Sequence, residues 1–241
     1  MILFYFKNKI KLDKQIEINL IQNIKEQKQL EELKITRALL DGEEHERQRI
    51  SQELHDGVGG LFSTVKLNFS LWSENSNLED KSDFNEILNQ LDYSISELRR
   101  ISENMSPASL INYGLIYSID DLCAFFSAKK ITIEFLPLNI NEKIISQNSQ
   151  LNIYRIIQEL LTNVIKHSHA KKVFIQCSQS ENLFLITVED NGIGIGKYFN
   201  DKGHGIFNIR KRVDYMNGKM DIKSKDNLGT IINIELIINE K

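Results

Sequence analysis

The feature that most limits the fold of this chain is a helical pattern of apolar residues that begins near residue 13 and continues beyond residue 100. Apolar residues recur at three-, four- or seven-residue steps, the spacing that gathers side chains on one face of an α-helix. No proline interrupts this stretch, because both prolines come later, at Pro107 and Pro137. The sequence therefore predicts long helices in the first part of the chain.

The first of these helices is predicted from Asp13 to about Glu46. It is rich in Gln, Glu, Lys, Ile and Leu, and its apolar face is broken by a polar run from Lys25 to Gln29. Such a pattern is typical of a moderately regular coiled coil, which indicates a dimerisation spacer over residues 13–45. The apolar positions are Ile16, Leu20, Ile24, Leu30, Leu33 and Leu40.

A second helical region follows and is predicted to fold back on itself. One apolar stripe extends from Ile50 to Phe69, and another extends from Phe84 to Met105, after a polar break between them. Two such helices form an antiparallel hairpin, whose wide apolar faces one copy cannot bury. We therefore expect residues 46–108 to pair with a second copy as a four-helix bundle, with Pro107 ending the second helix.

From residue 109 the pattern changes to short strand-like runs with helical segments between some of them. This mixture predicts a two-layer α/β domain over residues 109–241, with helices covering one face of a sheet, so the whole chain is expected to be α+β. The expected strands are Ile131–Leu136, Val173–Ser178, Phe184–Glu189, Met220–Lys223 and Thr230–Ile238, and the expected helices are Ile116–Ser127, Gln150–His167 and Gly205–Met216.

Charge and cysteine content exclude several classes of protein. The chain has 30 Lys and Arg against 33 Asp and Glu, for a net charge of −3. A protein that coats nucleic acid usually has a strong basic excess, so we expect no direct nucleic-acid binding. Cys123 and Cys177 lie far apart in the sequence and lack metal-ligand spacing, which favours a reduced, cytosolic setting over a disulfide framework.

The first residues give a separate indication. Met1 to Phe6 are all apolar, and Lys7, Lys9, Lys11 and Lys14 follow with only Asp13 opposing them. Six residues cannot span a bilayer core, which takes roughly 20. We interpret residues 1–12 as the end of a transmembrane helix and its juxtamembrane segment, which predicts a cytoplasmic domain of an inner-membrane protein. A frayed apolar start to a soluble helix is the alternative.

Glycines gather near the end of the chain, where they indicate a ligand site. Asp190 ends a predicted strand, and Gly192 and Gly194 follow it. A carboxylate fixed there can accept a hydrogen bond from an exocyclic amine, and glycines keep the adjacent space free of side chains. Gly203 and Gly205 precede and open a predicted helix, whose N-terminus suits a phosphate. A plain glycine-rich loop is the alternative for this part of the sequence.

The predicted helix Gln150–His167 carries a polar face opposite its apolar one. Glu159, Asn163 and the adjacent Lys166 and His167 share that face at helical spacing. An amide oxygen such as that of Asn163 is a suitable Mg²⁺ ligand, and Lys166 supplies a point charge for phosphate. An ordinary solvated face is the alternative, and His167 with His169 is more typical of surface histidines than of a metal site.

Taken together, these motifs resemble a known family. Glu159 to His167, Asp190-Asn-Gly192-Ile-Gly194, Gly203-His-Gly205 and Gly229-Thr230, in this order and spacing, are similar to the ATP-binding domain shared by gyrases, heat-shock chaperones, histidine kinases and mismatch-repair proteins. The resemblance covers roughly residues 110–240. It implies ATP and Mg²⁺, with Asp190 reading adenine, Asn163 holding Mg²⁺, and Lys166, His167, the glycines and Thr230 around the phosphates.

An upstream motif narrows the resemblance. The run from Glu46 to Asp56, which ends Glu53-Leu-His-Asp56, is similar to the phosphoacceptor box of sensor histidine kinases of the nitrate-sensor and desaturase-sensor type. His55 follows a residue of the apolar stripe, so it is expected at the edge of the buried face. The resemblance implies that His55 accepts phosphate and that Asp56 holds the ring tautomer and takes up its proton.

The resemblance also implies an activity and partners. It predicts autophosphorylation of His55 by ATP, then transfer to an aspartate of a response regulator that binds DNA, within a homodimer whose residues 13–45 form a signalling helix. Glu159 is expected to orient water on Mg²⁺ or to polarise the acceptor. A serine kinase or ATPase of the same superfamily and a nucleotide-binding scaffold without activity are alternatives. Gly60 occupies the position where this subfamily often has a glutamine for dephosphorylation, which puts phosphatase activity in question.

Overall fold

The computed structural model describes residues 2–75, 82–127, 131–195 and 204–238, and the chain divides into two units, Met1–Gly42 and Glu43–Lys241. Helix α1 (Ile2–Gln52) includes all the described residues of the first unit. Within that unit, the predicted coiled-coil positions Ile16, Leu20, Ile24, Leu30 and Leu33 are exposed. No helix in the described ranges is both long and apolar enough to cross a membrane. The side chains of residues 1–12, the predicted membrane segment, lie outside the described ones.

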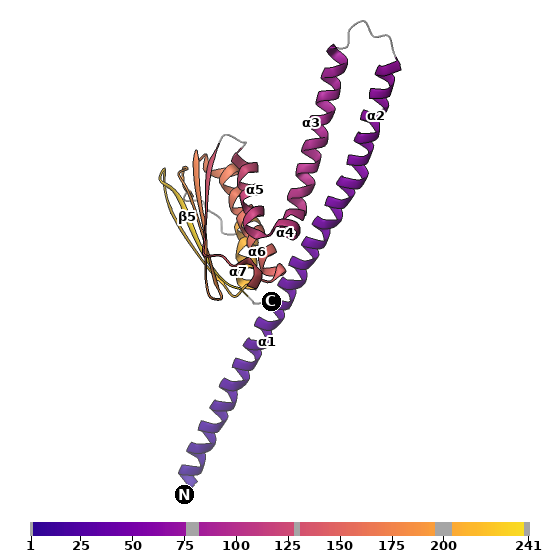
Figure 1. The fold of residues 1–241 in the computed structure, drawn as a ribbon. Helices are drawn as coiled ribbons and strands as arrows, with labels where there is room; N and C mark the ends of the chain where they lie inside the picture. The colour runs from indigo at the N-terminus through magenta and orange to yellow at the C-terminus, as the bar shows by residue number, and fades with distance from the viewer. Residues whose placement is uncertain (1, 76–81, 128–130, 196–203, 239–241) are drawn as a thin grey trace. The chain divides into compact units, whose positions relative to one another are not determined.

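The second unit begins with the helical hairpin. A π-helical segment (Glu53–Val58) follows α1 and leads into α2 (Gly59–Asn75), and α3 (Ser82–Met105) returns beside it (Figure 1). The Phe84 ring lies 6.3 Å from that of Phe69 and 6.1 Å from that of Trp72, measured between ring centroids. The predicted antiparallel hairpin is confirmed. Of the polar break predicted from Ser73 to Ser82, residues 76–81 lie outside the described ones.

Two helices connect the hairpin to the sheet. The short helix α4 (Ala108–Tyr113) and α5 (Leu115–Ser127) are separated by Gly114, whose φ of +88° is a left-handed conformation that favours glycine. The Glu142 carboxylate, from the 3₁₀ turn Glu142–Ile144, accepts hydrogen bonds from the backbone N–H groups of Leu115 and Ile116. These bonds satisfy two of the four donors that a helix start leaves open, which fixes where α5 begins.

A five-stranded sheet forms the second layer of the α/β domain. Its strand order is β1-β2-β3-β5-β4, with β1 and β2 parallel and the other neighbours antiparallel. Helix α6 (Gln147–Asn163) with its π-helical extension (Val164–Ser168) connects β1 to β2, and α7 (His204–Tyr215) precedes β4. The strands are β1 (Thr132–Leu138), β2 (Lys172–Ser180), β3 (Leu183–Asp190), β4 (Lys219–Lys225) and β5 (Gly229–Ile237).

The core of this domain lies between the sheet and helices α5, α6 and α7, which cover one of its faces (Figure 1). Every second residue of β3 and β5 is buried, as period-two alternation requires, and α6 buries most of its residues from Ser149 to Leu161. Each fully buried Leu, Ile or Phe contributes about 1.5–3 kcal/mol. The predicted two-layer α+β fold is confirmed, with Phe184, Ile186, Ile153, Ile157 and Leu115 among its fully buried side chains.

Candidate active site

Asp190 and Thr230 lie side by side at one end of the sheet. Asp190 is the last residue of β3 and pairs in register with Thr230, the second residue of β5. Both continue the buried alternation of their strands, and each is only 6% exposed. Their side chains therefore point toward the helical layer, where a ligand held between sheet and helices would contact them.

The Asp190 carboxylate is held in place by the backbone. Its Oδ1 accepts a hydrogen bond of 2.8 Å from the Gly192 N–H, and the Thr230 backbone donates a second bond. Burial raises the pKa of Asp190, while these two donors oppose the rise. The result is a fixed, partly desolvated acceptor that retains lone pairs for a ligand donor.

The loop after Asp190 is anchored to the end of the α6 extension. The Ile193 N–H donates to the Ser168 carbonyl at 2.8 Å, and Asn191 Oδ1 accepts from the N–H groups of Lys171 and Lys172. Gly229, with a φ of +89°, passes so close to the Asp190 carbonyl that a Cβ there would collide with it. The strand β3 end, the start of β5 and the α6 extension thus converge at one place.

Helices α6 and α7 meet at Asn163, Glu159 and Gly205. A Cβ built on Gly205 would lie 2.5 Å from Glu159 Oε1 and 2.8 Å from Asn163 Oδ1, so α7 begins directly against the polar face of α6. The Asn163 Nδ2 is buried without a hydrogen-bond partner. Buried polar atoms normally have partners, so an unsatisfied amide at this point fits a ligand site. Glu159 and Asn163 on α6 thus lie directly beside Gly205 at the start of α7.

The other predicted residues of the ATP-binding domain are Lys166, His167, Gly194 and Gly203. Lys166 and His167 are exposed in the π-helical extension that follows Asn163. Gly194, with a φ of +77°, lies close to the Lys225 carbonyl at the end of β4. Gly203 lies outside the described residues.

One residue of this region was not found from the sequence. Ser224 pairs in register with Thr230, and its hydroxyl lies 3.1 Å from that of Thr230. The same hydroxyl accepts a hydrogen bond of 2.7 Å from the Ile195 N–H, where the loop after Gly194 begins. Ser224 stands in a strand with no neighbouring motif, so only the strand register could have brought it to attention.

A second constellation lies on the hairpin, around His55. The imidazole Nδ1 lies 2.8 Å from Asp56 Oδ1, and both side chains are 65% exposed. If Nδ1 carries the proton, it donates to the Asp56 carboxylate and leaves the Nε2 lone pair directed at solvent. This geometry can attack an electrophile brought from outside and can hand the ring proton to a base.

The helix around His55 departs from regular α geometry. Residues Glu53–Val58 are π-helical, and the Gly59 N–H bonds to the Leu54 carbonyl, where the sequence predicted an uninterrupted α-helix. Gly57, Gly59 and Gly60 lower the helical propensity of this segment, which makes the wider turn accessible. Gly60 stands where the resemblance leads one to expect a glutamine, and the space around its missing Cβ is open.

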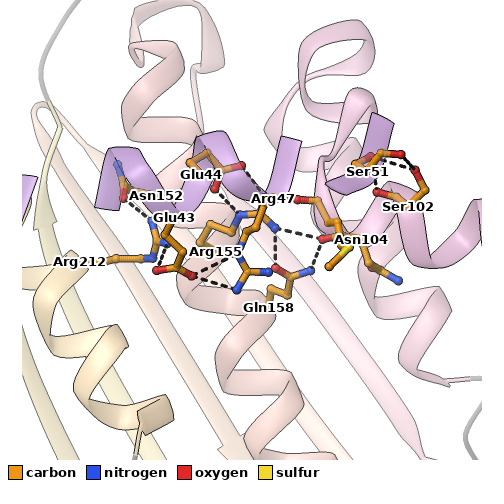
Figure 2. Close-up of polar contacts among 11 residues, drawn as sticks. Glu43, Glu44, Arg47, Ser51, Ser102, Asn104, Asn152, Arg155, Gln158 and Arg212 are labelled. Carbon is orange, nitrogen blue, oxygen red and sulfur yellow. Dashed lines mark hydrogen bonds and ion pairs between the residues drawn. The ribbon is translucent and has the colours of Figure 1, made fainter. Parts of the chain in front are cut away.

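One turn before His55, hydrogen bonds between two serines hold α1 against α3. The Ser51 and Ser102 hydroxyls lie 2.8 Å apart, and each donates to the other residue's backbone carbonyl at 2.9 Å (Figure 2). Both serines are buried. This reciprocal pair fixes α1 against α3 next to the π-helical segment, so the position of His55 on the hairpin is defined.

Family models match both constellations. Residues 46–110 match a family model described as "Histidine kinase", and residues 148–239 match one described as "Histidine kinase-, DNA gyrase B-, and HSP90-like ATPase". The first match contains His55 and Asp56, and the second contains Glu159, Asn163 and Asp190. The chain belongs to the histidine kinases. The resemblance seen in the sequence is confirmed, and the second part of this histidine kinase is an ATPase-type domain.

Similar proteins include kinases from several bacteria. Identity is 26% over 92% of this histidine kinase with the oxygen sensor histidine kinase NreB of Staphylococcus carnosus (65% of its length). It is also 26%, over 83% of the chain, with the signal transduction histidine-protein kinase/phosphatase DegS of Brevibacillus brevis (53% of its length). The chain thus spans between half and two thirds of these two relatives.

Among solved structures, the blue-light activated histidine kinase of Erythrobacter litoralis matches with 16% identity and a TM-score of 0.48. That match covers 77% of this chain and 60% of the other. The histidine kinase AdeS of Acinetobacter baumannii matches 74% of this chain and 95% of its own, with 17% identity and a TM-score of 0.43.

Proposed function

We propose that this chain is the phosphoryl-transferring part of a sensor histidine kinase, which phosphorylates His55 with ATP. The observation that carries the proposal is the buried, unpartnered Asn163 amide, set against Glu159 and the start of α7. A polar atom buried without a partner is costly unless a ligand supplies one. The His55–Asp56 pair on the hairpin supports the choice of acceptor.

The nucleotide would lie between the sheet end and helices α6 and α7. We propose that Asp190 accepts the hydrogen bond of the adenine amine and that Gly192 and Gly194 leave room for the base. Thr230, which the resemblance implies near the phosphates, pairs in register with Asp190 and would therefore lie beside the base instead. The phosphates would lie toward Gly203, Gly205, Lys166 and His167, near a helix N-terminus and a positive charge.

The Asn163 Oδ1 is the kind of oxygen that Mg²⁺ takes as a ligand, and the unpartnered Nδ2 beside it could donate a hydrogen bond to a phosphate oxygen. Mg²⁺ held by Asn163 would neutralise the negative charge that the phosphates develop during transfer. Glu159, whose Oε1 faces the same point as Asn163, would orient water there or polarise the acceptor.

The transfer step assigns a role to each group of the acceptor pair. The His55 Nε2 lone pair attacks the γ-phosphorus, the bond from that phosphorus to the β,γ-bridging oxygen breaks, and ADP leaves. The ring proton on Nδ1 passes to Asp56, so the phosphorylated ring becomes neutral. Because phosphoryl transfer depends mainly on positioning and charge, the two domains must approach each other for the reaction.

The proposed kinase function also implies two protein partners. We propose a homodimer formed by the hairpin, and an aspartate of a DNA-binding response regulator as the second phosphoryl acceptor. The apolar-then-lysine order of residues 1–14 supports attachment of this cytoplasmic part to a membrane. The relative DegS is named a kinase/phosphatase, but Gly60 cannot position water through a side chain, so we expect weak phosphatase activity of the usual type.

The test is incubation of the purified chain with γ-labelled ATP and Mg²⁺, alongside His55→Gln. We expect acid-labile, alkali-stable label on the parent chain and none on His55→Gln. His45→Gln is a matched control, because His45 is exposed on the same helix ten residues earlier and should keep the label.

Two results would contradict the proposal. Label that persists in His55→Gln and resists acid would identify a serine kinase. Measurable ATP binding without any labelled protein, even after candidate regulators are added, would identify a nucleotide-binding scaffold.

A further inference from the structure

The Ser224 hydroxyl on β4 contacts three groups at the end of the sheet. It accepts a hydrogen bond of 2.7 Å from the Ile195 N–H, donates to the Gly229 carbonyl at 3.1 Å, and lies 3.1 Å from the Thr230 hydroxyl. Ser224 and Thr230 are register partners on neighbouring antiparallel strands, so their side chains lie on the same face of the sheet. The hydroxyl therefore connects the loop that follows Asp190 to the residue that pairs with Asp190.

These three contacts use the full hydrogen-bonding capacity of the Ser224 hydroxyl, which has one hydrogen and two lone pairs. The Ile195 N–H binds one lone pair, and the Gly229 carbonyl accepts the hydrogen. Only the second lone pair is left for Thr230, so the Thr230 hydroxyl is the donor in that contact. Its hydrogen is then turned toward Ser224, and the lone pairs of Thr230 Oγ1 remain for a ligand.

Thr230 thus presents to a ligand the same kind of group as its neighbour Asp190. An ionised carboxylate can only accept hydrogen bonds, and both residues are buried side by side at the ends of their strands. Two adjacent acceptors suit a ligand group with two N–H donors, such as an exocyclic amine. A carbonyl oxygen in the same place would meet two further acceptors, and a buried acceptor without a donor costs binding free energy.

Backbone contacts hold the Ile195 N–H against Ser224. The N–H of Asn227, in the turn between β4 and β5, donates to the Ile193 carbonyl at 2.8 Å. Gly194, with a φ of +77°, lies so close to β4 that a Cβ there would be 3.0 Å from Ser224 Oγ. Because the loop is bound to the β4–β5 turn in this way, the first lone pair of Ser224 stays occupied.

We propose that Ser224 is a positioning residue that sets the base preference: it holds the Thr230 hydroxyl as an acceptor, so the site selects a 6-amino purine over a 6-oxo purine. The inference rests on the proposed function and deepens it, because it adds a residue that acts on the base through Thr230. Hypoxanthine differs from adenine by a carbonyl oxygen in place of the amine and by a hydrogen on N1. Its carbonyl would face Asp190 and Thr230 without a donor from either.

The test compares the affinities of ADP and inosine diphosphate, which carry the two bases and undergo no phosphoryl transfer, by calorimetry on the whole chain. We expect the parent chain to prefer ADP. In Ser224→Ala the Thr230 hydrogen can turn toward the ligand, so inosine diphosphate should bind more tightly and the preference should fall by about 2- to 10-fold, the range of one neutral hydrogen bond. Ser224→Thr keeps the hydroxyl and should keep the parent preference. Ser180→Ala, at an exposed position on β2 at the end of the sheet opposite Asp190, is the matched control.

A second substitution tests whether Ser224 acts through Thr230. Thr230→Val removes the hydroxyl and keeps the shape, so adding Ser224→Ala to it should leave the ratio of the two affinities unchanged. An effect of Ser224→Ala that persists in Thr230→Val would overturn the inference. So would an unchanged ratio in Ser224→Ala alone, including equal weakening of both nucleotides, which is the result of a purely structural role. A parent chain that binds neither diphosphate would overturn the nucleotide site as well, whereas binding without label on His55 would contradict only the kinase reaction.

Discussion

Asp190 and Thr230 are paired residues of β3 and β5, and both side chains point from the end of the sheet toward the helical layer. The pairing explains how two motifs forty residues apart become one site. The Thr230 backbone donates to the Asp190 carboxylate, and Gly229 lets β5 begin against the Asp190 carbonyl. A change at either residue therefore acts on the same acceptor.

Replacing Asp190 by Asn should weaken adenine nucleotide binding. The substitution removes the charge of an acceptor that accepts from Gly192 and, in our proposal, from the base. Hydrogen bonds to charged groups contribute about 1.5–3 kcal/mol, so we expect a loss of about 10- to 100-fold in affinity, measured by calorimetry. An Asn variant that binds ATP as tightly as the parent chain would remove Asp190 from the base-reading role.

The raised pKa of Asp190 also predicts how binding and stability respond to pH. The carboxylate is the accepting form, so affinity should fall as pH decreases through a value above the ordinary 3.8. The contribution of Asp190 to stability has the opposite sign, because the fold favours the protonated acid. It is fully present below pH 3.8 and is lost as pH rises through the raised pKa. Nucleotide titrations and denaturant unfolding on the acid side, with Asp190→Asn as reference, separate the two effects.

A methyl group at Gly205 should damage the nucleotide site. In Gly205→Ala the new Cβ would meet Glu159 Oε1 at 2.5 Å and Asn163 Oδ1 at 2.8 Å, so α7 must shift from α6. Overpacking of this kind costs about 1–3 kcal/mol, and we expect nucleotide affinity to fall by about tenfold or more. Gly42→Ala has open space around it and should leave affinity unchanged. Equal affinity in the two variants would contradict a site at this junction.

Much of the fold could be predicted from local patterns. The strand-like runs predicted all five strands to within a few residues, and one of them placed Asp190 at a strand end. The glycine motifs and the Asn163 motif could be recognised because each is a short run of the sequence with a local structural reason. The glycines allow a close backbone approach, and Asn163 lies on the polar face of a helix. What they could not show is the register that pairs Asp190 with Thr230 and brings in Ser224.

The contacts of Arg155 are the clearest example of a feature that could not be predicted from the sequence. The helix pattern identified Tyr154, Ile157 and Leu161 as a buried face, but Arg155 beside them is equally buried. A charge among buried residues requires a partner, and that partner, Glu44, lies 111 residues away. The π-helical segment at His55 could not be predicted for another reason. Glycines weaken a regular α-helix, but their presence in the sequence does not say whether the chain then adopts an α or a π turn.

Asp56→Asn should slow autophosphorylation while leaving nucleotide binding intact. Asp56 Oδ1 lies 2.8 Å from His55 Nδ1, and an amide there can no longer accept the ring proton as a base. Proton transfer by a positioned group contributes about 100- to 10,000-fold, so we expect a rate loss of about 100-fold. Rates of labelled phosphohistidine formation measure it at saturating ATP. A variant with the parent rate would show that the Asp56 carboxylate is dispensable.

The two thiols should be unreactive in the folded chain. Cys123 and Cys177 are buried in the core of the α/β domain, and burial raises the pKa of Cys123 to about 12 and that of Cys177 further. The thiolate is the reactive form, so a thiol-specific reagent at pH 8 should react only after denaturant unfolds the domain. Rapid reaction of either cysteine in native buffer would contradict the burial of this core.

The hairpin should form a dimer, because it leaves large apolar side chains exposed along α2 and α3, including Leu61 at 68% and Trp72 at 55%. We expect a light-scattering mass near twice the 27.9 kDa of one chain at micromolar concentration. In Leu61→Glu each dimer loses two buried leucines, worth about 1.5–3 kcal/mol apiece, so the mass should fall toward one chain. Ile111→Glu, at a 77% exposed position on α4, is the control that should stay dimeric. A parent chain with the mass of one protomer would show that this apolar face has another partner.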